Sequence, residues 1–322
     1  METLLCYLFL TSRVATVSRF LALFVAFIAC SAQADVRVLT SIKPLQQIAA
    51  AVQDGVGSPD VLLPPGASPH HYALRPSDVR KVGDADLLYW IGPDMENFLP
   101  RVLGSRGKPT VAVQSLAGMQ LRHFGEDSHS HDEDDHDDDH DDHDHDHRPG
   151  SLDAHLWLSS VNARVIATKM AGDLAAADPA NAARYQGNLK AFVERLDALD
   201  LRIKQRVAGI AGKPYFVFHE AFDYFEANYG LKHTGVFSVA AEVQPGAQHV
   251  AAMRKRLQEV GKTCVFSEPP LRPRLAETLT AGLPVRLAEL DALGGTDPVD
   301  AKGYERLLEK LGADLAGCLE QL

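Results

Sequence analysis

Short apolar runs alternate with longer, partly polar stretches along most of the chain. Runs such as 87–91 and 215–218 have the length of buried strands, and the stretches after them repeat apolar residues every three or four positions. This alternation predicts two α/β lobes with parallel sheets flanked by helices. We expect strands at 36–40, 61–63, 87–91, 110–113, 215–218, 236–239, 263–267 and 285–290, and an extended stretch at 156–158. We expect helices at 45–52, 77–81 (capped by Ser77), 95–103, 160–176 (capped by Ser160), 220–229, 245–260, 274–281 and 303–319.

One stretch, from Asn181 to Ala208, predicts a much longer helix. Its apolar residues keep spacings of three and four from Tyr185 to Ile210. At 1.5 Å per residue it would be about 40 Å long, a length that suits a rod between two lobes. We therefore expect an N-terminal lobe at 35–177, a linking helix at 178–210 and a C-terminal lobe at 211–322.

The N-terminus has the features of an export signal. An apolar run at 20–29 follows two arginines, and Ala32-Gln33-Ala34 matches the small-x-small cleavage pattern. The run is too short for an ordinary transmembrane helix. We expect residues 1–34 to be a signal peptide cleaved before Asp35, and the mature chain to be periplasmic; lipidation at Cys30 is the alternative.

Two of the four cysteines, Cys264 and Cys318, lie in the expected mature chain. An exported protein enters an oxidising compartment, which favours a disulfide between them. Two buried thiols are the alternative.

The charge of the chain is concentrated in one segment. The 322 residues carry a formal charge of −11, but residues 126–147 contain thirteen Asp and Glu and no Lys or Arg, so the remainder sums to +2 (−11 plus 13). We therefore expect no nucleic-acid partner. The segment lacks apolar residues, so we expect a flexible loop at about 124–150 that binds metal weakly. Its candidate ligands are His129, His131, His136, His140, His143, His145 and His147.

Three other histidines occupy loops at strand ends or helix entries. His70 follows the predicted strand 61–63, His219 follows 215–218, and His155 precedes the helix at 160–176. In parallel α/β lobes, such loops at the carboxyl ends of strands line the ligand cleft. Because His70 and His155 precede the long helix and His219 follows it, they predict a site between the lobes.

The remaining histidines are weaker candidates. His71 neighbours His70, and adjacent residues of an extended segment point in opposite directions, so only one of them faces the cleft; we choose His70. His249 is expected on a helix surface and His233 in a solvated turn, while His123 has no clear interpretation.

A carboxylate could complete the site. Asp291 follows the predicted strand 285–290, and Glu268 follows 263–267 in the same way. Glu220 is next to His219, but a carboxylate at a helix start is favoured by the helix dipole without any ligand. Three neutral imidazoles and one oxygen suit tetrahedral Zn²⁺, whereas Mn²⁺ favours more carboxylates.

The chain resembles the solute-binding proteins of high-affinity zinc ABC importers, the ZnuA-type members of the metal-binding cluster A-I family. The similar stretches span nearly the whole mature chain. They are VLLPPGASPHHYALRPSDV (61–79), DADLLYWIGPDME (84–96), DAHLWLS (153–159), YFVFHEAFDYF (215–225), EVQPGAQ (242–248), CVFSEPP (264–270) and LDALG (290–294).

The resemblance implies two α/β lobes joined by a rigid helix, with Zn²⁺ held in the cleft by His70, His155 and His219. It places the C-terminal aspartate of the family at Asp291 and its disulfide at Cys264 and Cys318. Some zinc-binding members have a glutamate before the first histidine, where this chain has Pro69, so Asp291 or a water fills the fourth position. It also implies an inner-membrane permease and its ATPase as partners, and we expect a monomer without enzymatic activity.

Other functions remain open at this stage. Three histidines and a carboxylate also describe a catalytic zinc site, so a zinc-dependent hydrolase is one alternative, although no general-base motif accompanies the histidines. A manganese or iron transport component is another. A metal-buffering or adhesion protein without a permease is a third.

Overall fold

The computed structural model describes residues 35–125, 150–238, 246–269 and 274–322. The predicted signal peptide (1–34) and the histidines predicted as weak ligands, from His129 to His147, lie outside the described residues. The same is true of 239–245 and 270–273. Among the described helices, none combines the length and apolar character that a membrane crossing requires.

The N-terminal lobe is built on a parallel sheet with the strand order β2-β1-β3-β4. Every residue of β1 and β3 is buried, which explains their continuous apolar sequences. Helix α2 begins with Pro44 in its first turn and packs its apolar face on the sheet. The elements are β1 (Val38–Thr40), α2 (Lys43–Val52), β2 (Asp60–Val61), α3 (Pro76–Asp84), β3 (Leu87–Trp90), α4 (Pro100–Leu103), β4 (Thr110–Ala112), 3₁₀ turns Val113–Ser115 and Leu156–Leu158, and α5 (Ser160–Ala177).

The C-terminal lobe repeats the arrangement with the parallel order β6-β5-β7-β8. One face of its sheet joins the main core, and the other forms a separate apolar cluster with α8 and α9 that includes Phe216, Phe237 and Met253. The elements are β5 (Tyr215–His219), α7 (Asp223–Tyr229), β6 (Gly235–Ser238), α8 (Ala247–Val260), β7 (Thr263–Ser267), α9 (Arg274–Thr280), β8 (Val285–Glu289) and α10 (Gly303–Leu319).

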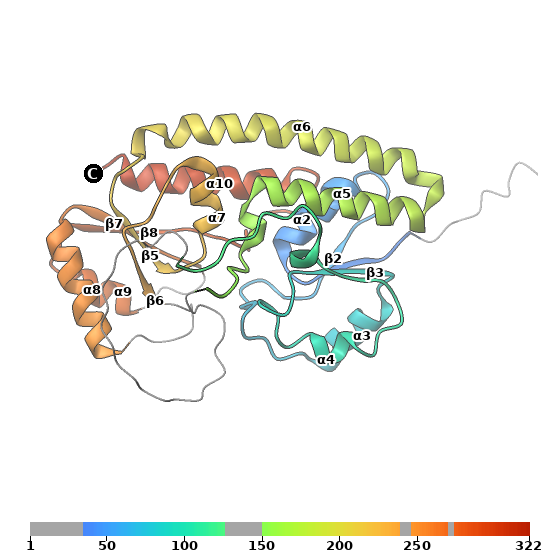
Figure 1. Ribbon diagram of the computed structural model, residues 1–322, viewed down its shortest axis with the longest axis horizontal. Coiled ribbons are helices and arrows are strands. Elements are labelled where there is room, and N and C mark those ends of the chain that lie inside the picture. Colours follow the sequence, from blue (N-terminus) through green and yellow to red (C-terminus); the bar gives the residue numbers. More distant parts are fainter. Residues whose placement is uncertain (1–34, 126–149, 239–245, 270–273) are drawn as a thin grey trace, which may run out of the picture. The chain divides into compact units, whose positions relative to one another are not determined.

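The long helix α6 (Ala182–Val207) lies between the two lobes in the sequence, with 3₁₀ turns at Pro179–Asn181 and Ala208–Ile210. It runs along α5 and α2 at one end and α10 at the other (Figure 1). Its buried face carries the predicted apolar residues, among them Tyr185, Phe192 and Ile203. Arg195 and Arg202 form ion pairs with Glu305 and Glu309 of α10. Apolar burial and these ion pairs therefore both hold α6 against the C-terminal lobe. The predicted domain boundaries at 177/178 and 210/211 stay a prediction.

The disulfide between Cys264 and Cys318 is confirmed. It joins β7 to the last turn of α10, across 54 positions of sequence. On the chain-entropy model a loop of this size stabilises the folded lobe by about 4 kcal/mol.

Four local predictions are wrong. Residues 156–158 form a 3₁₀ turn rather than an extended stretch. Ser159, not Ser160, caps α5, because its Oγ accepts the backbone N–H of Asn162. Arg75 occupies the cap position of α3 and Ser77 lies inside the helix. The helix expected at 95–103 is limited to α4, and Met95–Leu99 form turns whose Met95 and Leu99 are buried.

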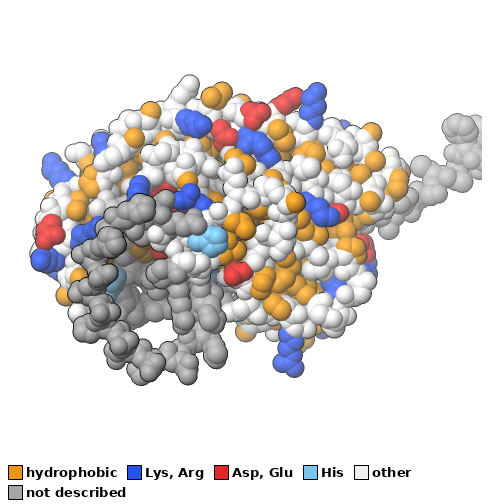
Figure 2. All heavy atoms as spheres, viewed as in Figure 1, with side chains coloured by type: hydrophobic (Ala, Val, Ile, Leu, Met, Phe, Trp, Pro, Cys, Tyr) orange, Lys and Arg blue, Asp and Glu red, His pale blue; other side chains and the backbone are white. Residues whose placement is uncertain are grey.

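Basic and acidic side chains are interspersed on the face of the molecule shown in Figure 2, rather than gathered into a patch of one sign.

Candidate metal centre

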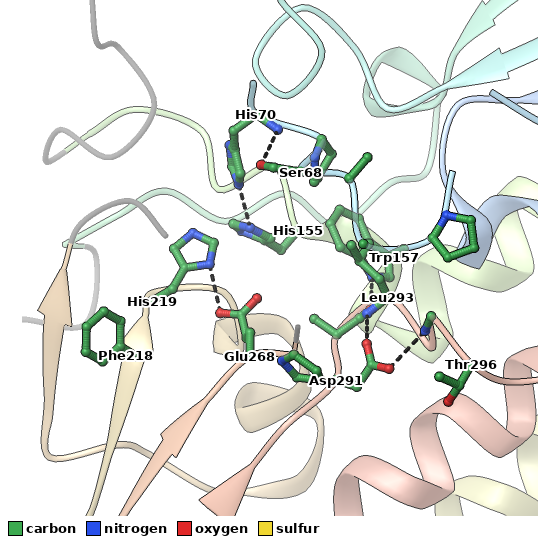
Figure 3. Close-up of a pocket in the computed structure, with 17 residues that line it drawn as sticks. Ser68, His70, His155, Trp157, Phe218, His219, Glu268, Asp291, Leu293 and Thr296 are labelled. Atoms are coloured by element: carbon green, nitrogen blue, oxygen red, sulfur yellow. Dashed lines mark hydrogen bonds and ion pairs between the residues drawn. The ribbon is translucent and has the colours of Figure 1, made fainter. Parts of the chain in front are cut away.

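His70, His155 and His219 come together in the structure. The centroids of their rings lie 4.9 to 5.3 Å apart, and each residue is at most 4 % exposed. One ligand atom from each lies within 4.8 Å of the other two. Figure 3 shows the three rings turned toward one another. We call this group the cleft site.

The spacing within the cleft site suits a small tetrahedral cation. Nε2 of His70 lies 3.3 Å from Nε2 of His155. Zn²⁺ binds nitrogen at about 2.0–2.1 Å, and two tetrahedral ligands at that distance are roughly 3.3 Å apart. The site lies in a cavity of about 480 Å³, whose lining also includes Trp157, Phe218 and Ala292.

The loop after β2 positions His70. Pro64, Pro65, Gly66 and Ala67 form a tight turn in which the N–H of Ala67 donates to the carbonyl of Pro64 (3.1 Å). Gly66 has φ of +78°, a conformation that this turn requires and that glycine adopts without strain. The backbone N–H of His70 then donates to Oγ of Ser68 (3.2 Å), which fixes the residue at the cavity wall.

Carboxylates hold the other two imidazoles. Nδ1–H of His155 donates to Oδ1 of Asp153 (2.8 Å), which also accepts the backbone N–H of His155 (2.9 Å). Nδ1–H of His219 donates to Oε1 of Glu268 (2.9 Å). With the proton on Nδ1, each ring presents the lone pair of Nε2, the form that a metal ligand needs.

Burial raises the pKa of the Asp153 carboxyl well above its usual range, although the hydrogen bond from the backbone of His155 opposes this shift. Asp153 is not exposed at all. A cation bound by the neighbouring imidazole would favour the ionised carboxylate, so the hydrogen bond between Asp153 and His155 would strengthen when the site is filled.

Asp291 has a structural role in addition to the ligand role expected from the sequence. It lines the same cavity, but it is not in the group whose ligand atoms lie within 4.8 Å. Oδ1 accepts the N–H groups of Leu293 and Gly294, and Oδ2 accepts that of Gly295 (2.8–3.0 Å). Figure 3 draws Asp291 beside Leu293 at the cavity wall. Its carboxylate therefore holds the loop after β8, and its role as a ligand stays a prediction.

Contacts across the cavity join the loops of the two lobes. The indole N–H of Trp157 donates to the carbonyl of Ala292 (2.8 Å), and the hydroxyl of Tyr304 donates to the carbonyl of Trp157 (2.6 Å). Nζ of Lys43, in α2, donates to the carbonyl of Gly295 (2.9 Å). The loop after β8 is thus held against α2 and the 3₁₀ turn that follows His155.

The other histidines differ in their exposure and in their contacts. His71 is exposed, which agrees with the choice of His70, and His249 is exposed on α8 as predicted. The prediction for His233 is wrong: its side chain is only 14 % exposed and Nδ1 donates to Oε2 of Glu226 (2.9 Å). The sequence did not predict the contact between His233 and Glu226, because Glu226 lies in the preceding helix and no local pattern places its side chain beside His233. His123 forms an isolated bridge with Leu152 beside the undescribed segment.

Comparison with known proteins places the chain in a family. Residues 38–318 match the family described as "ZnuA: Zinc-uptake complex component A periplasmic". The chain belongs to the ZnuA family. The high-affinity zinc uptake system protein ZnuA of Yersinia pestis is 38% identical over 298 residues, covering 89% of this chain and 92% of that protein. The ZnuA protein of Brucella suis is 37% identical over 306 residues, with 88% and 92% covered.

Solved structures support the same fold. The SBP FpvC from Pseudomonas aeruginosa, in complex with Mn²⁺, matches with a TM-score of 0.72 and 21% identity, covering 89% of this chain and 99% of that chain. A zinc-bound ZnuA lacking residues 138–173 matches with a TM-score of 0.71 and 22% identity, covering 88% and 97%. These neighbours hold different metals, so the fold alone does not determine which cation is bound. The donor atoms of the site must determine it.

Proposed function

We propose that this protein captures Zn²⁺ in the periplasm and delivers it to the permease of a high-affinity zinc ABC importer. The convergence of His70, His155 and His219 carries the proposal. Membership of the ZnuA family supports it, as do the relatives named as parts of zinc uptake systems.

The donor set favours zinc among the divalent metals. Three imidazoles leave one position of a tetrahedron, which Zn²⁺ fills readily with a water. Manganese prefers more oxygen ligands in a larger shell. The carboxylates that contact the ligand rings, Asp153 and Glu268, already accept their N–H groups, and Asp291 accepts three backbone N–H groups. We therefore assign the fourth position to a water.

We propose that release depends on the arrangement of the lobes. His70 and His155 belong to the lobe before α6, whereas His219 ends β5 of the lobe after it. Docking on the permease and its ATPase needs to move only one lobe to withdraw one of three ligands. The remaining two imidazoles bind Zn²⁺ much more weakly, so the ion leaves toward the membrane.

The proposal includes export and processing. We propose that residues 1–34 direct the chain to the periplasm and are removed before Asp35, and that the mature protein acts as a monomer without enzymatic activity. Mass spectrometry of the protein recovered from the periplasm would give the N-terminus, and light scattering its molecular mass. A retained leader would contradict the assigned cleavage, and a stable dimer the assigned state.

Elemental analysis and calorimetric titration of the mature protein test the function. We expect one tightly bound Zn²⁺ per chain that survives dialysis, and preferential retention of Zn²⁺ when Mn²⁺ and Fe²⁺ compete. Deleting residues 126–147 should remove the weak binding that this segment contributes and leave the tight site. Retention of Mn²⁺ or Fe²⁺ over Zn²⁺ would support a different transport function, and loss of the tight site on deletion would contradict its assignment to the cleft.

A further inference from the structure

A second group of metal-ligating side chains lies outside the cleft site. One ligand atom each from Glu220, Asp223 and His233 lies within 4.8 Å of the other two. They line a cavity of about 150 Å³, together with Glu226 of α7 and with Arg122, His123 and Gly125. We call these four side chains, Glu220, Asp223, Glu226 and His233, the acidic pocket.

The acidic pocket is enclosed rather than spread over the surface. The side chains of Asp223 and His233 are 19% and 14% exposed, and that of Glu226 is 5% exposed. Partial burial limits the access of water and salt, so charges within the pocket interact more strongly than they would on an open surface.

His233 experiences the field of this pocket. Its Nδ1 lies 2.9 Å from Oε2 of Glu226 and 3.7 Å from Oδ1 of Asp223. Burial lowers its pKa, but the hydrogen bond to Glu226 and the charges of the three carboxylates outweigh burial and raise the pKa above the usual value. The other charged side chains at the wall are Arg122 and Lys232, and His123 lines it as well. The pocket therefore attracts positive charge at the position of its imidazole.

We propose that Glu220, Asp223 and His233 form a second binding site for a divalent transition-metal cation such as Zn²⁺. Two carboxylates and an imidazole are a ligand set that Zn²⁺ accepts, and a divalent ion balances the carboxylates better than a single proton on His233 does. Glu226 lies close enough to orient the imidazole as an outer carboxylate. Affinity is lower than at the cleft site, because only one imidazole contributes and Arg122 and Lys232 lie at the wall.

The position of this second site in the chain indicates what it could be used for. Arg122, His123 and Gly125 line the pocket, and the chain continues from them directly into the acidic, histidine-rich stretch of the sequence. The backbone N–H of Arg122 donates to the hydroxyl of Tyr224, and that hydroxyl donates to the carbonyl of Asp153, the residue that holds His155 (2.9 Å each). A cation in the acidic pocket therefore lies beside the contacts that support the cleft site, which suits an intermediate station for the cargo.

Equilibrium dialysis of the full mature chain against micromolar Zn²⁺, followed by elemental analysis, tests the second site. We expect His233→Ala to bind one Zn²⁺ fewer per chain than the matched control His249→Ala, which alters an exposed histidine on α8. Asp223→Asn should show the same loss, and it keeps the shape of the side chain in case His233→Ala unfolds. Circular dichroism of each variant checks the fold.

Further measurements distinguish failure of the second-site proposal from failure of the cleft-site proposal. The cleft site should keep its tight Zn²⁺ in His233→Ala and in Asp223→Asn, as measured by calorimetric titration, whereas His219→Ala should lose it and keep the weaker ion. Crystals of the wild-type protein soaked in ZnCl₂ should show anomalous scattering between Glu220, Asp223 and His233. Equal Zn²⁺ content in folded Asp223→Asn and His249→Ala would overturn the second site and leave the cleft site untouched.

Discussion

The cleft site and the acidic pocket begin at neighbouring residues and differ in chemistry. His219 ends β5 and turns toward His70 and His155, whereas Glu220 belongs to a group with Asp223 and His233. Adjacent residues at a strand end point in opposite directions, so a single turn supplies both groups. The cleft site has three buried imidazoles, and the acidic pocket has one imidazole among carboxylates, of which Asp223 is partly exposed and Glu226 is buried.

This difference explains why two sites in one protein are expected to bind the same ion with different affinities. In the cleft site, neutral nitrogen donors are buried, and carboxylates outside the ligand shell orient two of them. In the acidic pocket the carboxylates themselves are the candidate ligands, and they attract protons and other cations as well as zinc. Tight and selective binding is expected only where the carboxylates support the imidazoles.

The largest expected effect separates the two regions directly. His219→Ala removes a ligand from the cleft site alone, so we expect the affinity for the tightly bound Zn²⁺ to fall by more than about 100-fold, beyond the usual effect of losing an outer carboxylate. Calorimetric titration with a competing chelator measures this change. Wild-type affinity in this variant would reject the cleft site, and the exposed His249→Ala serves as its control.

Acidification should affect the cleft site next most strongly. Histidine coordinates a metal only when neutral, and its ordinary pKa is near 6.5, so protons compete with Zn²⁺ below neutral pH. We expect affinity to fall by about tenfold to 100-fold between pH 7.5 and about 5.5. Titrations across this range with the Zn²⁺ activity held by a chelator measure the slope. A flat profile would mean that imidazoles are not the principal ligands.

A smaller loss of Zn²⁺ affinity is expected when a carboxylate that orients an imidazole is changed. Glu268→Gln keeps the size of the side chain but removes the charge that accepts Nδ1–H of His219, so we expect about a tenfold loss of affinity. The matched control is Glu259→Gln, which changes an exposed glutamate of α8. Titration of both variants gives the comparison, and equal affinities would show that Glu268 does not orient the ring.

The smallest effect on zinc concerns Asp291. We expect Asp291→Asn to leave affinity nearly unchanged and to destabilise the protein by about 1–3 kcal/mol, because one of three backbone N–H groups loses its acceptor. Denaturant unfolding without metal measures stability, and calorimetry measures affinity. A loss of affinity as large as that of His219→Ala would instead make Asp291 a ligand.

Most of the fold could be predicted from periodicity. The bounds of β7 and α10 match the prediction, since their apolar residues keep one period from end to end. The prediction failed where polar side chains compete for the backbone. Asp153 binds the N–H of His155 and the chain there winds into a 3₁₀ turn, although residues 156–158 have the apolar character of a strand.

The sequence by itself determined the parallel α/β lobes, the long helix and the three histidines, because strand and helix periods and the positions of strand ends are local properties. Only the tertiary structure decided which carboxylates support the imidazoles, why Asp291 holds a loop, and that His233 is mostly enclosed. Those outcomes depend on contacts between residues far apart in the chain, such as His219 with Glu268, and no local pattern encodes such a distance.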